Sequence, residues 1–102
     1  MHMLVVDDEV DTANMLAEYF RMEGYEVTTA HSGAEALAAA SAESALDIIL
    51  LDVNMPGMDG FEVCRRLREH VSCPIIFLTA RVEDVDQLDG FAAGADDYVL
   101  KP

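Results

Sequence analysis

The sequence predicts one α/β domain, built on a parallel β-sheet with helices on both of its faces. Short apolar runs rich in β-branched residues alternate along the chain with stretches of helical spacing, which is the pattern of βα units. The apolar runs show little polar alternation, as expected for strands that are buried on both sides. A length of 102 residues suits a single compact domain, so we assign residues 1–102 to one domain with right-handed crossovers.

The expected strands are short and are bounded by polar or turn-forming residues. We place them at residues 3–6, 27–29, 48–51, 75–78 and 98–100. Helices are expected between them, at residues 12–23, 33–42, 60–70 and 82–93. The sequence stops at Pro102, directly after the last strand, so the expected fold lacks a fifth helix. A following helix or a partner chain would then cover the remaining patch of sheet.

Two helices carry specific local signals. The first has one apolar stripe, formed by Met15, Leu16, Tyr19 and Phe20. Ser32 and Glu35 have the spacing of a capping box, which predicts the start of the second helix.

Composition excludes several function classes. The formal net charge of -14 repels phosphate backbones, so we expect no direct contact with nucleic acid from this chain. No apolar run approaches the ~18 residues of a membrane span, and no N-terminal stretch has the features of an export signal. We therefore expect a cytoplasmic protein without membrane contact. With only Cys64 and Cys73, no disulfide framework is predicted.

Polar residues stand at the carboxyl ends of four expected strands. Asp7 and Asp8 follow the first strand, Asp52 the third, Thr79 the fourth and Lys101 the fifth. The carboxyl ends of parallel strands form the crevice in which α/β sheets bind ligands. We therefore expect these side chains to converge at one edge of the sheet.

The chemistry of this group favours a hard divalent cation. Asp7, Asp8 and Asp52 would repel one another unless a cation neutralised them, and carboxylate oxygens suit Mg²⁺. Zinc is disfavoured because the histidines are scattered; we assign His2, His31 and His70 to surface or packing positions. A metal, a carboxylate, a hydroxyl and an ammonium group together make a phosphoryl site, in which an aspartate attacks phosphorus.

The same residues resemble the receiver domain of bacterial two-component response regulators. The resemblance covers the whole chain and rests on five motifs: VVDDE at 5–9, LLDVNMPGMDG at 50–60, LTA at 78–80, GADDY at 94–98 and KP at 101–102. It implies a flavodoxin-like (βα)5 fold with strand order 2-1-3-4-5. It also implies phosphorylation by a sensor histidine kinase.

Each site residue then takes the role that its motif position implies. Asp52 is the implied phosphoacceptor, and Asp7, Asp8, Asp52 and the main-chain carbonyl of Asn54 are the implied Mg²⁺ ligands. The resemblance further implies that Lys101 and Thr79 contact the phosphoryl oxygens, that Thr79 and Tyr98 form a switch pair, and that the bond preceding Pro102 is cis. Asn54, Ala80 and Arg81 stand where the family tunes access and the lifetime of its acyl phosphate.

The residues of the last three motifs most resemble those of regulators that carry a winged-helix DNA-binding domain. Such proteins dimerise through the fourth helix, the fifth strand and the fifth helix, with a basic and an acidic residue on the fourth helix. Those positions are Gln87 and Ala92 in this chain, which weakens the expectation of a homodimer through this face. Asp96 and Asp97 remain as ion-pair acceptors.

The leading expectation is a phosphoacceptor switch that controls transcription, with no enzyme activity beyond its own phosphorylation and dephosphorylation. One alternative is an aspartyl-phosphate phosphatase of the haloacid dehalogenase type. Such enzymes place a second aspartate two residues after the nucleophile, where this chain has Asn54, which cannot transfer the proton. The other alternative is a stand-alone receiver or binding module without a DNA output.

Overall fold

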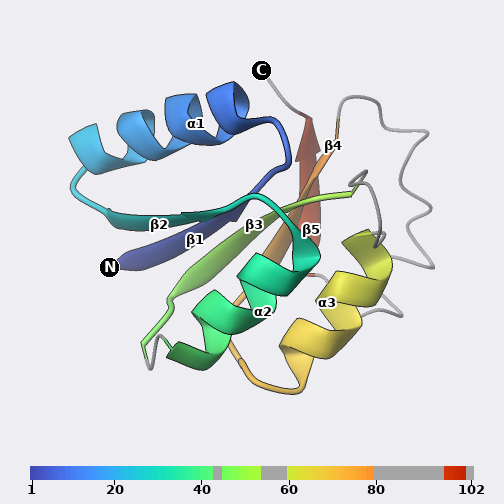
Figure 1. Ribbon diagram of the computed structural model, residues 1–102. Helices are drawn as coiled ribbons and strands as arrows, with labels where there is room; N and C mark the ends of the chain where they lie inside the picture. Colours follow the sequence, from blue (N-terminus) through green and yellow to red (C-terminus); the bar gives the residue numbers. More distant parts are fainter. Residues whose placement is uncertain (43–44, 54–59, 80–95, 101–102) are drawn as a thin grey trace.

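The computed structural model describes residues 1–42, 45–53, 60–79 and 96–100, which form a five-stranded parallel sheet with its covering helices (Figure 1). Its strands are β1 (His2–Val6), β2 (Glu26–Ala30), β3 (Ile48–Asp52), β4 (Ile75–Thr79) and β5 (Asp97–Leu100). All neighbours pair in parallel, in the order β2-β1-β3-β4-β5. The predicted fold class and strand order are therefore confirmed.

Three helices in the described ranges cover the two faces of this sheet. They are α1 (Val10–Met22), α2 (Gly33–Ala42) and α3 (Gly60–Arg68), and Figure 1 shows α1 on one face and α2 with α3 on the other. The helix expected at residues 82–93 lies outside the described residues. No helix in the described part of the chain is both long and apolar enough to cross a membrane.

Alternate side chains of the strands enter two separate apolar clusters. In β1, Leu4 and Val6 belong to the cluster under α2 and α3, whereas Met3 and Val5 belong to the cluster under α1. All four are buried. This two-sided burial explains why the strands are continuously apolar in sequence.

The apolar stripe predicted for α1 does not contain the most buried residues of the helix. Ala13 and Ala17 are fully buried, whereas Met15 is 50% exposed and Tyr19 is 58% exposed. Leu16 and Phe20 are partly buried and pack against the cluster under α1. Met15, Leu16, Tyr19 and Phe20 together line an apolar surface cavity of about 310 Å³.

The start of α2 uses the predicted capping residues. The Glu35 backbone N–H donates to Ser32 Oγ at 3.1 Å, which satisfies one amide at the helix start. The Glu35 carboxylate accepts from the Ser32 hydroxyl at 3.3 Å. The Glu35 side chain of the capping box therefore bonds to the Ser32 hydroxyl.

An ion pair ties the end of α3 to the amino ends of β4 and β5. Asp96 Oδ2 accepts from Arg68 Nη2 at 2.8 Å and from the Ile75 backbone N–H at 2.9 Å. Arg68 Nη1 also donates to the Cys73 carbonyl at 2.7 Å. Asp96, which the sequence left as an acceptor for a partner chain, therefore has a partner within its own chain.

The two cysteine thiols differ in their burial. Cys64 on α3 is fully buried, and this desolvation raises the pKa of its thiol to about 11, against a smaller lowering by Arg68. Burial also raises the pKa of Cys73, which is half-buried. The thiolate is the reactive form, so both thiols are weak nucleophiles near neutral pH.

We expect Cys73 to react with an alkylating reagent at pH 8 at least roughly tenfold faster than Cys64 in the native protein, because Cys64 combines full burial with the higher thiol pKa. Peptide mass mapping over a labelling time course measures this ratio. A sample labelled in denaturant is the control, in which both thiols should react alike. Equal native rates would contradict the burial of Cys64.

Candidate functional site

Three carboxylates, which we call the acid cluster, meet at the carboxyl edge of the sheet. Asp7, Asp8 and Asp52 each offer one oxygen, and these oxygens lie within 4.8 Å of one another. The register explains the approach, because β1 and β3 pair Val6 with Leu51 and so deliver Asp7 beside Asp52. Asp7 is 0% and Asp52 is 3% exposed, whereas Asp8 is half-buried.

The backbone around Asp7 is held by hydrogen bonds. Its N–H donates to the Ala30 carbonyl at 3.0 Å, which continues the β1–β2 ladder. Its Oδ1 accepts from the Glu9 backbone N–H at 3.0 Å. Its carbonyl oxygen lies 3.0 Å from His31 Nδ1. The first carboxylate of the acid cluster is thus fixed by groups from the end of β2 and from the loop after β1.

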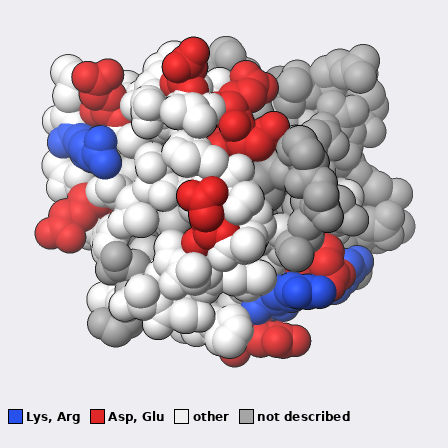
Figure 2. All heavy atoms as spheres, in the orientation of Figure 1, with Lys and Arg blue, Asp and Glu red and all other residues white. Residues whose placement is uncertain are grey.

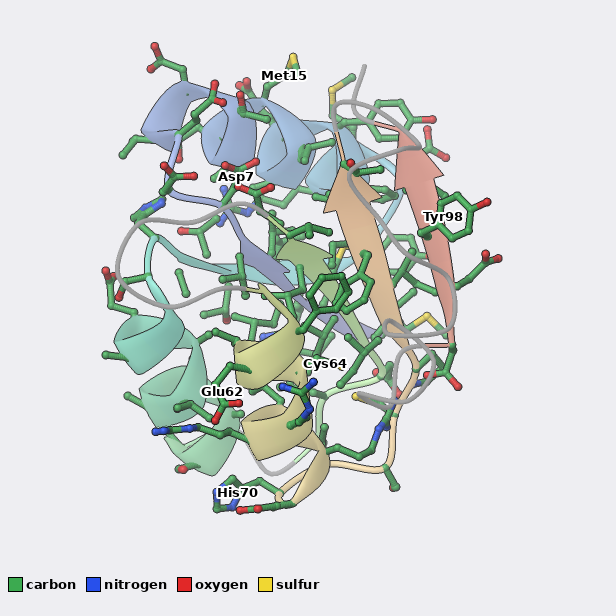
Figure 3. The ribbon with its side chains drawn as sticks, turned by 90° about the vertical axis from the view of Figure 1, so that its right-hand side faces the viewer. Asp7, Met15, Glu62, Cys64, His70 and Tyr98 are labelled. Atoms are coloured by element: carbon green, nitrogen blue, oxygen red, sulfur yellow. The ribbon has the colours of Figure 1, made fainter. Side chains whose placement is uncertain are left out.

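Thr79 and Tyr98 lie on the two strands beyond β3. Thr79 ends β4 at the same edge as Asp52 and is fully buried. Tyr98 is half-buried on β5, opposite Phe77 in register, and packs against the cluster under α2 and α3. Figure 3 shows its ring projecting from β5 toward the side of the molecule. The remaining predicted site residues lie outside the described residues: Asn54, Ala80, Arg81, Lys101 and Pro102.

The start of α3 presses against the strand that carries Asp52. The Gly60 N–H donates to the Val53 carbonyl at 2.9 Å. A Cβ at Gly60 would lie 2.6 Å from Val53 Cα and 2.8 Å from the Asp52 carbonyl oxygen. Only a residue without a side chain fits there, so Gly60 sets how closely α3 approaches the acid cluster.

His31, which the sequence analysis assigned to a surface or packing position, lies beside the acid cluster. His31 follows β2 directly and is half-buried at the edge of the acid cluster. Its position in the sequence could have indicated this placement. Strand β2 lies next to β1, and His31 directly follows Ala30, which pairs in register with Val6. His2 and His70 lie away from this edge, and Figure 3 shows Asp7 and His70 at opposite ends of the molecule.

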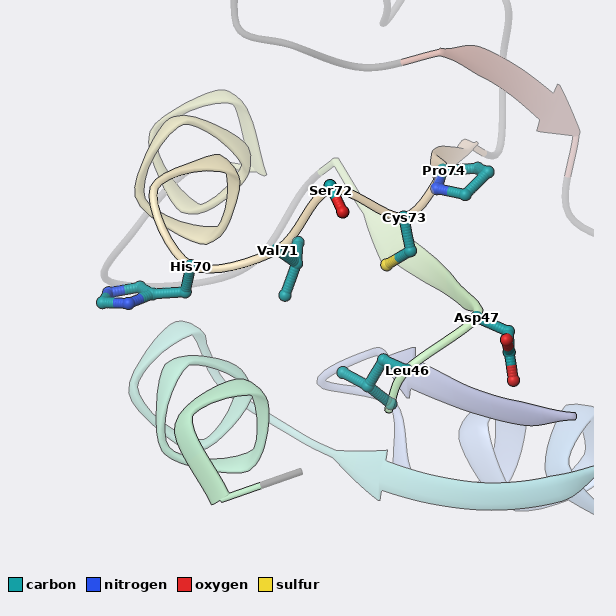
Figure 4. Close-up of a pocket in the computed structure, with 7 residues that line it drawn as sticks. All are labelled: Leu46, Asp47, His70, Val71, Ser72, Cys73 and Pro74. Carbon is teal, nitrogen blue, oxygen red and sulfur yellow. The ribbon is translucent and has the colours of Figure 1, made fainter. Parts of the chain in front are cut away.

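A cavity of about 360 Å³ lies elsewhere, at the amino ends of β3 and β4 (Figure 4). Its lining comes from the segments before these strands: Leu46, Asp47, His70, Val71, Ser72, Cys73 and Pro74. None of these residues is a predicted site residue. The predicted chemistry of the chain is therefore concentrated at the opposite edge.

The donor set at the acid cluster fits a hard divalent cation. All three candidate ligand atoms are carboxylate oxygens, the ligands that Mg²⁺ prefers. Figure 2 shows acidic side chains spread over the visible face, with basic side chains gathered at few places. Asp7 and Asp52 differ from those surface acids because they are buried beside each other. A bound cation would offset the repulsion between their negative charges.

Comparison with known proteins identifies close relatives. Residues 3–102 match the family described as the response regulator receiver domain. The chain is 48% identical over 99 residues to the transcriptional regulatory protein ResD of Bacillus subtilis, covering 97% of this chain and 41% of that protein. It is 46% identical over 99 residues to the sensory transduction protein RegX3 of Mycolicibacterium smegmatis, covering 97% of this chain and 43% of that protein. The chain thus spans about two fifths of the length of these curated relatives.

Solved structures of two proteins are also similar to this chain. The chemotaxis protein CheY4 of Vibrio cholerae superposes with a TM-score of 0.92 at 38% identity, covering 99% of this chain and 86% of that chain. The response regulator TrrA of Thermotoga maritima, solved in complex with Mg²⁺ and BeF, gives a TM-score of 0.88 at 39% identity with the same coverage.

Proposed function

Because this chain belongs to the response regulator receiver domain family, we propose that it is a phosphoacceptor switch that takes a phosphoryl group onto Asp52. Receiver domains are signalling modules rather than conventional enzymes. The observation that carries the proposal is the meeting of Asp7, Asp8 and Asp52 within 4.8 Å at one sheet edge. In this proposal residues 1–102 act as the receiver domain of a cytoplasmic regulator.

Asp52 is the proposed nucleophile. One of its carboxylate oxygens forms a bond to phosphorus, while the bond from phosphorus to the donor breaks and its electron pair leaves with the donor. For a sensor histidine kinase, the leaving atom is an imidazole nitrogen. Burial at the end of β3 holds the Asp52 carboxylate in one position for this attack.

Asp7, Asp8, Asp52 and the carbonyl of Asn54 would hold Mg²⁺. When bound, Mg²⁺ supplies positive charge that offsets the negative charge of the transferring phosphoryl group. Asp7 contributes a preset geometry, since its Oδ1 already accepts from the Glu9 N–H. In the same proposal Lys101 contacts the phosphoryl oxygens.

The switch is proposed to run through Thr79 and Tyr98. Thr79 is buried at the end of β4 and would donate its hydroxyl to the phosphoryl group on Asp52. Tyr98 is half-buried on the neighbouring strand, and its ring would change position when Thr79 moves. Asn54, Ala80 and Arg81 would tune access to the acyl phosphate, and a cis bond before Pro102 would place Lys101.

The output is proposed to be transcription. ResD is named a transcriptional regulatory protein, and this chain covers 41% of its length. A DNA-binding segment outside residues 1–102 would therefore contact DNA, in keeping with the net charge of -14 on this chain. Dimerisation through the fourth helix and β5 belongs to the same proposal.

The test is phosphorylation by a small phosphodonor. In the presence of Mg²⁺ the protein is expected to gain one phosphoryl group, and peptide mapping after chemical trapping of the acyl phosphate should place it on Asp52. A parallel sample with a metal chelator is the control and should gain little. No adduct with Mg²⁺ present, or an adduct on another residue, would reject the proposal.

A further inference from the structure

His31 lies outside the predicted site residues, yet it hydrogen-bonds to the backbone of Asp7, a member of the acid cluster, from the end of a neighbouring strand. Its Nδ1 lies 3.0 Å from the carbonyl oxygen of Asp7. A carbonyl oxygen can only accept, so Nδ1 must carry the hydrogen and donate it. This donor is present in the Nδ1–H neutral form and in the imidazolium, so the bond does not depend on the ring being charged.

The accepting carbonyl belongs to the peptide unit that joins Asp7 to Asp8. Peptide units are planar, so fixing this carbonyl fixes the orientation of the whole link between the two acids. The Asp7 N–H is held at the same time by the Ala30 carbonyl. Both backbone polar groups of Asp7 are therefore bonded to consecutive residues at the end of β2.

His31 is itself well placed to hold that link. It stands between β2, which ends at Ala30, and α2, which begins at Gly33 and is capped by Ser32. It is half-buried, so neighbouring groups restrict the ring. A hydrogen bond from a restricted side chain costs less conformational entropy than one from a mobile surface residue.

We propose that His31 is a positioning residue for the acid cluster, which orients the Asp7–Asp8 peptide so that both carboxylates point at one cation. The inference rests on the proposed function, since it concerns the same Mg²⁺ site. His31 acts through Asp7 and is not a ligand. Outer partners that orient metal ligands commonly change metal affinity by about 10–100-fold when removed.

The test compares His31→Ala, His31→Asn and His31→Gln, with His70→Ala as the matched control. Asparagine places its amide nitrogen near the position of Nδ1, whereas glutamine carries its amide one bond further along. His70 is exposed, so its removal leaves the acid cluster intact. Mg²⁺ affinity is measured by titration without phosphodonor, and exchange of the Glu9 amide is measured in the metal-free protein.

His31→Ala and His31→Gln are expected to weaken Mg²⁺ binding by roughly tenfold and to speed exchange of the Glu9 amide. In His31→Asn the Mg²⁺ affinity and the exchange rate of the Glu9 amide should lie near the wild-type values. His70→Ala should match wild type in both. If His31→Ala fails to fold, the difference between the Asn and Gln variants decides the question.

Unchanged affinity in His31→Ala, or equal affinities in the Asn and Gln variants, would overturn the positioning role while wild-type Mg²⁺ binding upheld the proposed function. A wild-type protein that binds no Mg²⁺ would overturn the proposed function and the positioning role together.

Discussion

Asp52→Asn is expected to abolish phosphorylation and, in the metal-free protein, to raise the free energy of unfolding by about 1–3 kcal/mol. The amide offers no carboxylate oxygen for attack on phosphorus, so the adduct should disappear. Stability should rise because Asp52 and Asp7 are both buried and their oxygens lie within 4.8 Å of each other and of Asp8. Replacing one charge by a neutral group of the same shape relieves that repulsion.

Added Mg²⁺ should reverse the order of stabilities. A cation that binds only the folded protein stabilises it according to its concentration and affinity, and the variant has lost one ligand. Denaturant unfolding with a chelator and with saturating Mg²⁺ measures both effects. Glu69→Gln, which removes one exposed charge after α3, is the control and should change stability little under either condition. A variant that is phosphorylated, or that is less stable than wild type without metal, would contradict this account of the acid cluster.

Gly60→Ala is expected to destabilise the protein by about 1–3 kcal/mol and to weaken Mg²⁺ binding at the same time. The added Cβ would lie 2.6 Å from Val53 Cα and 2.8 Å from each of the Asp52 and Val53 carbonyl oxygens. All three atoms are backbone, so no side-chain rotation relieves the contact. Either α3 or the end of β3 must move, and a movement of β3 displaces Asp52.

Gly24→Ala is the matched control for this prediction. Gly24 has a φ of 98°, but a Cβ added there would meet no atom within 4 Å, so its substitution strains only the local backbone. We expect a loss of about 1 kcal/mol with unchanged Mg²⁺ affinity. Denaturant midpoints and Mg²⁺ titrations on both variants separate the two effects. Loss of stability in Gly60→Ala without any change in Mg²⁺ affinity would show that α3, and not β3, gives way.

The sequence was sufficient to place Asp7 and Asp52 together. Parallel strands deliver the residues after their carboxyl ends to one edge, and the apolar runs before Asp7 and Asp52 were long enough to identify as strands. The order of the strands came from the family resemblance and agrees with the observed sheet. The site residues beyond Thr79, among them Lys101, keep their assigned roles as predictions.

The most buried residues of α1 could not be identified from the sequence. An apolar stripe can be recognised from spacing, but Ala13 and Met15 are both apolar, and the pattern does not say which of them lies nearest the sheet. In the structure Ala13 and Ala17 are fully buried, whereas Met15 and Tyr19 lie at the surface.

Backbone partners explain the other omissions. His31 donates to a carbonyl group, Gly60 contacts main-chain atoms of the preceding strand, and Asp96 accepts from the Ile75 amide. Each of these contacts is made to a backbone atom, so it depends on the path of the chain and not on the residue type of the partner. The Arg68–Asp96 pair also joins residues 28 positions apart, which no local spacing rule detects.

The strand order has a consequence for how neighbouring molecules meet. Among the described strands, β2 and β5 each have a partner on one side only, and such open edges are templates for aggregation. Exposed acids stand on both, Glu26 on β2 and Asp97 on β5, and Arg21 donates to the Val27 carbonyl of β2 at 2.9 Å. We therefore expect the acidic excess that disfavours nucleic acid also to disfavour the joining of open edges of two molecules into one longer sheet.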